Sequence, residues 1–139
     1  MMKWEDFPRV DLEFMNEDHK RCLGLIESLL QKCDAQFECN DNNYEEIDSA
    51  LTDLSDHLVE HFKSEEEAMH ATGFPPYYVH KTEHDSVLQQ FKSEVSSWHS
   101  SRDLKALRRY IAINVLNWLE THALTMDTVS AQHVASCQT

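Results

Sequence analysis

Residues 43–71 read NYEEIDSALTDLSDHLVEHFKSEEEAMHA and decide the fold class. Apolar side chains recur in this stretch every three or four residues, which is the spacing of one face of an α-helix. They are Ile47, Leu51, Leu54, Leu58, Phe62 and Met69. Gly73, Pro75 and Pro76 follow, and residues of these types end helices. The stretch therefore predicts a long amphipathic helix over Asn43–Ala71 that buries one face.

Three other segments show the same periodicity. The first runs from about Asn16 to Gln36, the next begins near Pro76 and ends before Ser100, and the last runs from about Arg102 to Ala131. Four helices with short connections predict an all-α, up-down-up-down four-helix bundle. Residues 1–139 are interpreted as a single domain of this kind, in which residues 1–15 form an extended N-terminal arm. Two aromatic residues, Trp4 and Phe7, are expected to anchor the arm.

Composition excludes several classes of protein. The chain has 139 residues with 2 Gly and 3 Pro, too few for the turns of an all-β protein. A net charge of −13 argues against nucleic-acid or anionic membrane partners, and no apolar run is long enough to span a membrane. The N-terminal residues lack the apolar stretch of a signal peptide. We expect a cytoplasmic protein, monomeric rather than oligomeric, whose four cysteines are free thiols.

Nine histidines are an excess for a chain of this length, and such an excess suggests a metal site. In an up-down-up-down bundle, the start of the first helix, the end of the second, the start of the third and the end of the fourth share one end. Seven potential metal ligands occupy those positions: His19, His61, Glu65, His80, His84, His122 and Asp127. Each local spacing alone is weak support, but the shared height across four helices predicts one metal site.

This ligand set also favours a particular chemistry. Five imidazoles, two bridging carboxylates and a bridging oxide or hydroxide would fill all but one of the positions of two six-coordinate metals. Iron, manganese and zinc suit nitrogen and oxygen ligands, and iron would give the open position a redox use. Trp118 and Phe62 adjoin two candidate ligands and are interpreted either as an apolar collar around the site or as ordinary core residues.

Asp127 does not fit a regular helix. It follows His122 by five residues, which places it about 140° away from the His122 face. A π-bulge, local unwinding or a bend would bring both side chains to one site. We therefore expect irregular backbone near Asp127.

At these residues the chain resembles the hemerythrin family, specifically the single-domain bacterial hemerythrins. The resemblance extends from Trp4 to about Val129. It rests on NEDHK around His19, HFKSEEEAM from His61, GFP from Gly73, HKTEH from His80 and WLETHALTMD from Trp118. It implies a non-haem di-iron centre, oxo- or hydroxo-bridged, that binds O2 reversibly for transport, storage or sensing, without catalysis. The implied ligands of one iron are His80, His84 and His122.

By the same resemblance, His19 and His61 hold the second iron, which keeps the open position, and Glu65 and Asp127 bridge the two. One departure is Asn16, where the family usually carries Asp. The remaining histidines are read as non-ligands: His57 is assigned to the polar core or to support of a ligand, and His70, His99 and His133 to solvent. In the run of three glutamates only Glu65 is expected to face inward.

Other functions remain open on the sequence alone. His80 to His84 matches H-x-x-E-H, a zinc-hydrolase motif in which Glu83 would act as base. Glu67 and His70 give a single Glu-x-x-His motif, where a ferritin-like di-iron oxidase needs two. A metal-free interaction module is the third alternative. Lys105, Arg108 and Arg109 form a basic patch that is either solvated or a docking surface for a redox partner protein.

Overall fold

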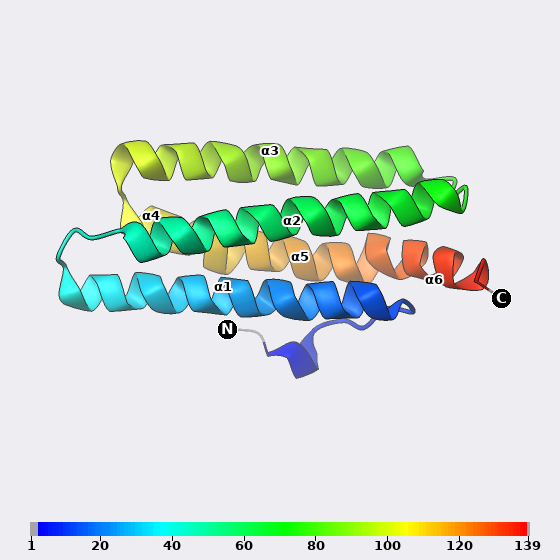
Figure 1. The fold of residues 1–139 in the computed structure, drawn as a ribbon, viewed down its shortest axis with the longest axis horizontal. Helices are drawn as coiled ribbons and strands as arrows, with labels where there is room; N and C mark the ends of the chain where they lie inside the picture. Colours follow the sequence, from blue (N-terminus) through cyan, green and yellow to red (C-terminus); the bar gives the residue numbers. More distant parts are fainter. Residues whose placement is uncertain (1–2, 139) are drawn as a thin grey trace.

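The computed structural model describes residues 3–138. Four long helices lie side by side and alternate in direction, as Figure 1 shows. The first three are continuous, and the fourth consists of five consecutive segments without a break. Their bounds are η1 Trp4–Asp6, α1 Glu13–Cys39, α2 Glu45–Ala71, α3 Tyr77–Ser101, α4 Leu104–Arg109, η2 Tyr110–Val115, α5 Leu116–His122, η3 Ala123–Asp127 and α6 Thr128–Ser136. The predicted four-helix bundle is confirmed.

The helix ends have local causes. Asn40 and Arg102 adopt left-handed backbone with φ of 51° and 53° and end α1 and α3. Gly73 has a φ of 65° in the turn after α2, a conformation that glycine adopts without strain. The side chain of Asp103 accepts a hydrogen bond from the Ala106 amide and caps α4. Each of the connections between the long helices is therefore short.

The apolar stripes meet in one large core, and a smaller cluster forms separately from Val10, Leu12, Met15, Ala131 and Val134. Ile26, Leu54 and Ile111 are fully enclosed at the centre of the large core, and the predicted stripe of α2 lies in the same core up to Phe62. Cys22 and Cys33 are buried free thiols, as expected. Within the described residues, no helix combines the length and apolar character needed to cross a membrane.

The N-terminal arm is less extended than predicted. Residues 4–6 form a short 3₁₀ turn and α1 already begins at Glu13, so the last three residues of the predicted arm are helical. Phe7 reaches the main core, as expected, and Trp4 packs against its edge. The arm is also fixed through Asn16, whose side-chain amide accepts from the Val10 amide and donates to the Val10 carbonyl, both at 2.9 Å.

The fourth helix differs most from expectation. It extends to Ser136, five residues beyond the predicted end at Ala131, and contains two π-helical segments. The segment Ala123–Asp127 confirms the irregular backbone predicted near Asp127. The segment Tyr110–Val115 was not anticipated, because its buried residues Ile111 and Val115 keep an ordinary helical spacing in the sequence. The start of α1, the end of α2, the start of α3 and the end of the fourth helix share one end of the bundle (Figure 1).

Candidate metal centre

The structure brings the seven predicted residues together inside the bundle. Each bundle helix contributes: α1 one histidine, α2 a histidine and a glutamate, α3 two histidines, and the fourth helix a histidine and an aspartate. All seven are 2% exposed or less. Acids and imidazoles are rarely buried in such number without a partner that compensates them.

The potential ligand atoms form two groups. His80, His84 and His122 gather with Glu65 and Asp127, while His19 and His61 gather with the same two carboxylates; within each group the atoms lie within 4.8 Å of one another. Two carboxylates common to a group of three imidazoles and a group of two are what a pair of bridged metal ions requires. The arrangement thus offers two adjacent metal positions.

Several buried atoms at the centre approach one another without forming hydrogen bonds. His80 Nε2 lies 3.1 Å from Asp127 Oδ1, yet neither atom has a hydrogen-bond partner among the described residues. Both carboxylate oxygens of Glu65 are also buried without one. His84 Nε2 and His122 Nε2 lie 3.0 Å apart. Unpaired buried polar atoms cost about 1–3 kcal/mol each, and cations between them would remove that cost. The donor set therefore fits two metal ions.

Carboxylates on the outer side orient three of the imidazoles. Nδ1 of His61 donates to Asp18, Nδ1 of His84 to Glu66 and Nδ1 of His122 to Glu83, each at 2.9 Å. A proton on Nδ1 leaves Nε2 with its lone pair directed into the site. Such partners fix the ring orientation and make the imidazole a stronger metal ligand.

None of these three hydrogen bonds was predicted from the sequence. The prediction that Glu66 lies on an exposed face is wrong: Glu66 is half-buried and hydrogen-bonded to His84. Each of the three adjoins a candidate ligand in sequence but contacts a histidine of a different helix. Adjacency to the ligands was the one available signal, and it does not specify the partner.

The π-helical segment places Asp127. A π turn contains more residues than an α turn, so five residues bring the side chain back close to the face of His122. The hydroxyl of Thr128 donates to the carbonyl of Ala123 five residues earlier at 2.8 Å, which supports the wider turn. As a result, Asp127 Oδ1 lies 3.1 Å from Nε2 of His122 and of His80.

Aromatic rings enclose the imidazoles. Phe62 stacks on His84 with ring centres 4.0 Å apart, and Trp118 stacks on His122 at 4.4 Å. Both predicted collar residues therefore contact the site, and Phe62 belongs to the main core as well. Phe7 of the arm adds a third ring, 5.4 Å from that of His19. Together they limit the access of water to the candidate centre.

The electrostatics of the site favour positive charge. Burial alone would lower the pKa of His61, but the nearby Glu65 and the hydrogen bond to Asp18 raise it to about 10. Burial opposes charge on His80 in the same way, while Asp127 and Glu65 raise its pKa to about 9. The pKa of Glu65 is held well below its usual value against the effect of burial, chiefly by His61. Cations of either kind, protons or metals, are therefore stabilised here.

The other histidines lie outside the two groups. His57 donates from Nε2 to the Asp18 carbonyl at 2.9 Å and stacks on His61, so it supports a ligand, as expected. His70 and His99 are exposed, as predicted. His133 is a correction: it is half-buried and donates to the Thr72 carbonyl at 2.9 Å.

The two enzyme alternatives find little support in this geometry. Glu83, the base required by the H-x-x-E-H motif, accepts the Nδ1 proton of His122. Glu67 and His70 of the single Glu-x-x-His motif are both exposed on the outside of α2.

The basic patch of Lys105, Arg108 and Arg109 is partly paired, because Arg108 donates to Asp34 at 2.7 Å.

Comparison with known proteins agrees with this site. The family model described as the hemerythrin HHE cation binding domain matches residues 10–132. A bacteriohemerythrin of Aquifex aeolicus is 27% identical over 123 residues, covering 88% of this chain and 87% of the relative. One of Methylococcus capsulatus is 26% identical over 82% of this chain and 81% of its own. The crystal structure of wild-type hemerythrin has the same fold, with a TM-score of 0.78, 23% identity and 97% of both chains covered. The chain belongs to the hemerythrin family.

Proposed function

We propose that the protein binds O2 reversibly at a non-haem di-iron centre formed by the seven clustered residues. The observation that carries this proposal is the pair of ligand groups that share Glu65 and Asp127. His80, His84 and His122 would hold one iron, His19 and His61 the other, and the two carboxylates would bridge them. The family supports the same reading, since its members are O2-binding metalloproteins rather than enzymes.

The unequal number of imidazoles makes the two metal positions different. With three protein nitrogens on one side and two on the other, the second metal would have one more coordination position without a protein ligand than the first. A small molecule can bind there without displacing a side chain. When bound, a pair of ferrous ions supplies the electrons that make O2 binding possible and reversible.

The protein's own residues control what reaches that position. Phe62 and Trp118 cover two imidazoles of the first group, and Phe7 lies against His19 of the second. The carboxylates Asp18, Glu66 and Glu83 keep the Nδ1 protons in place and the Nε2 lone pairs directed inward. Together these residues orient the imidazoles and exclude water from the centre.

The proposal is tested by following the visible absorption spectrum of iron-loaded protein through cycles of deoxygenation and O2 addition. We expect a charge-transfer band that appears with O2, disappears on its removal and returns in several cycles. A Phe62→Ala variant opens the apolar cover without removing a ligand, and it should lose the oxygenated form faster through oxidation of the irons. A spectrum indifferent to O2, or one oxidation event that never reverses, would contradict the function.

We also propose a cytoplasmic, monomeric protein that can dock to a redox partner. Four free cysteines, two of them exposed, suit a reducing compartment. The exposed Lys105 and Arg109 offer a small basic surface on an otherwise acidic chain, which suits an acidic partner. Cell fractionation tests the cytoplasmic location, and sedimentation of the protein tests the monomeric state. Reduction rates measured before and after charge reversal at Lys105 and Arg109 test the docking to a redox partner.

A further inference from the structure

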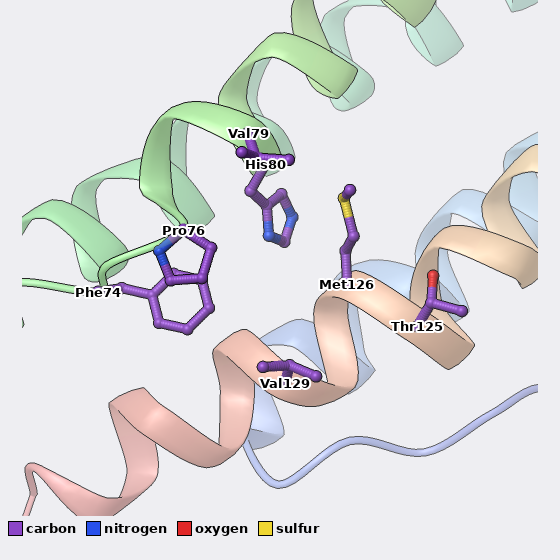
Figure 2. Close-up of a pocket in the computed structure, with 7 residues that line it drawn as sticks. All are labelled: Phe74, Pro76, Val79, His80, Thr125, Met126 and Val129. Atoms are coloured by element: carbon purple, nitrogen blue, oxygen red, sulfur yellow. The ribbon is translucent and has the colours of Figure 1, made fainter.

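An apolar pocket opens beside the candidate metal centre. It has a volume of about 280 Å³ and lies between the start of α3 and the segment that joins η3 to α6. Figure 2 shows Phe74 and Pro76 on one side and Met126 and Val129 on the other. The imidazole of His80 projects from α3 into the space between them (Figure 2). The pocket thus connects the surface of the bundle to a proposed ligand.

His80 differs from the other imidazoles in its outer nitrogen. Nε2 faces the metal centre, 3.1 Å from Asp127 Oδ1, so Nδ1 lies on the opposite side of the ring. In residues 3–138, this Nδ1 has no hydrogen-bond partner, whereas those of His61, His84 and His122 each have a carboxylate. Nδ1 of His19 also lacks a partner, but it is fully enclosed by protein. His80 is therefore the imidazole whose outer nitrogen an external molecule can reach.

The proposed function determines the chemistry of that nitrogen, and the inference rests on it. An imidazole that binds iron through Nε2 keeps its proton on Nδ1, which makes Nδ1 a hydrogen-bond donor. Here the donor faces walls formed by Phe74, Val79, Met126 and Val129. A donor that faces apolar walls stabilises a guest that brings one acceptor and an otherwise apolar surface.

We propose that this pocket binds a small, uncharged, largely apolar molecule whose single acceptor oxygen, as in a ketone or ester, accepts the Nδ1 proton of His80. A carboxylic acid anion fits less well, because the chain carries a net charge of −13 and the walls offer the anion no compensation. The volume corresponds to about nine waters, or a guest of roughly that many non-hydrogen atoms. Such a guest would supply to His80 the acceptor that Glu66 and Glu83 supply to its neighbours.

The first experiment tests whether the site exists, using iron-loaded protein and cyclohexanone as the probe. The protein carries ¹³C-methyl methionine, and the Met126 methyl resonance is followed during titration. We expect a saturable shift, lost or weakened at least tenfold when Val129→Phe fills the pocket. The matched control is Val59→Phe, which changes a similarly exposed valine on α2 and should bind as the wild type does. Val79→Phe replaces Val129→Phe if that variant does not fold.

The second measurement tests the hydrogen bond. The infrared carbonyl band of bound cyclohexanone should lie below its frequency in an alkane, as expected for an oxygen that accepts a proton from His80. A Met126 resonance that does not saturate, or one that Val129→Phe leaves unchanged, would overturn the site. A carbonyl band at the alkane frequency would overturn the role of His80. Iron content and the O2 response, measured on the same samples, show separately whether the proposed function has failed.

Discussion

At the scale of single residues, the five imidazoles of the site differ in what holds their outer nitrogens. His61 depends on Asp18, a half-buried carboxylate on a neighbouring helix, at 2.9 Å. Burial raises the pKa of Asp18, but the hydrogen bond from His61 outweighs it and lowers the pKa below its usual value. Asp18 is therefore charged at neutral pH and available to strengthen His61 as a ligand.

Replacing this carboxylate tests its role directly. We expect Asp18→Asn to lower iron affinity about tenfold, because the amide accepts the Nδ1 proton more weakly than a carboxylate does. Competition with a chelator of known affinity measures the change. Asp53→Asn removes an exposed aspartate from α2 and serves as the control. Equal affinities for both variants would show that Asp18 does not tune the centre.

Asn16 has a structural role that an aspartate could not fill in the same way. Its amide both donates to and accepts from the backbone of Val10, whereas a carboxylate can only accept. Asn16→Asp should destabilise the protein by about 1–3 kcal/mol and release the arm. Denaturant unfolding measures the loss of stability, and cleavage after Arg9 by trypsin reports the release of the arm. Asn117→Asp, on the exposed side of α5, adds the same charge and should leave both unchanged.

At the scale of elements, the π-helical segment Ala123–Asp127 determines whether the fourth helix can offer two ligands. Inserting one alanine after the exposed Leu124 would add a residue between the two ligands and rotate Asp127 by about 100° away from the site. We expect this variant to retain its helical circular dichroism and to lose iron. The substitution Leu124→Ala keeps the chain length and should load normally. Full iron content in the insertion variant would refute this role of the π segment.

The far end of the bundle is held by a polar contact between α2 and α3. Asp48 accepts hydrogen bonds from Trp98 and from Arg102, both at 2.8 Å. Burial raises the pKa of Asp48, but these donors outweigh it and lower the pKa below its usual value. Since the folded-state pKa is the lower one, the stabilisation is complete above the unfolded pKa of about 4 and is lost as the pH falls through the folded pKa.

This contact gives a pH-dependent prediction. In metal-free protein, Asp48→Asn should lower the free energy of unfolding by at most about 1 kcal/mol at pH 7, with a smaller difference from the wild type at pH 3. Urea unfolding at both pH values measures it, with Asp53→Asn as the reference. A difference that is the same at both pH values would mean that the charge of Asp48 contributes nothing.

Helix positions were predictable because burial imposes a period on the sequence, and the stripe from Ile47 to Phe62 shows this most clearly. Their ends were predicted where Gly and Pro follow, as at Ala71, but not elsewhere. Helix α1 begins three residues before the predicted Asn16, where the side chain of Asn16 ties the preceding loop through Val10. The segment Tyr110–Val115 was missed because no ligand spacing there conflicts with an ordinary helix.

At the scale of the whole molecule, the topology of the bundle made the site predictable. Alternating helix directions convert position in the chain into height along the bundle, so residues as distant as His19 and Asp127 could be assigned to one site. The contacts of Asp18, Glu66 and Glu83 could not be assigned, because each crosses to another helix and depends on side-chain packing. The pocket at His80 likewise arises from the packing of α3 against the fourth helix.

The most direct test of the central claim is the metal content of the protein, measured per chain after expression with ample iron. Two irons per chain are predicted in the wild type, because two ligand groups share Glu65 and Asp127. Asp127→Ala, which removes one shared carboxylate, should fall below two while the helical fold is kept. A single zinc, or no bound metal in a folded wild-type protein, would contradict the claim.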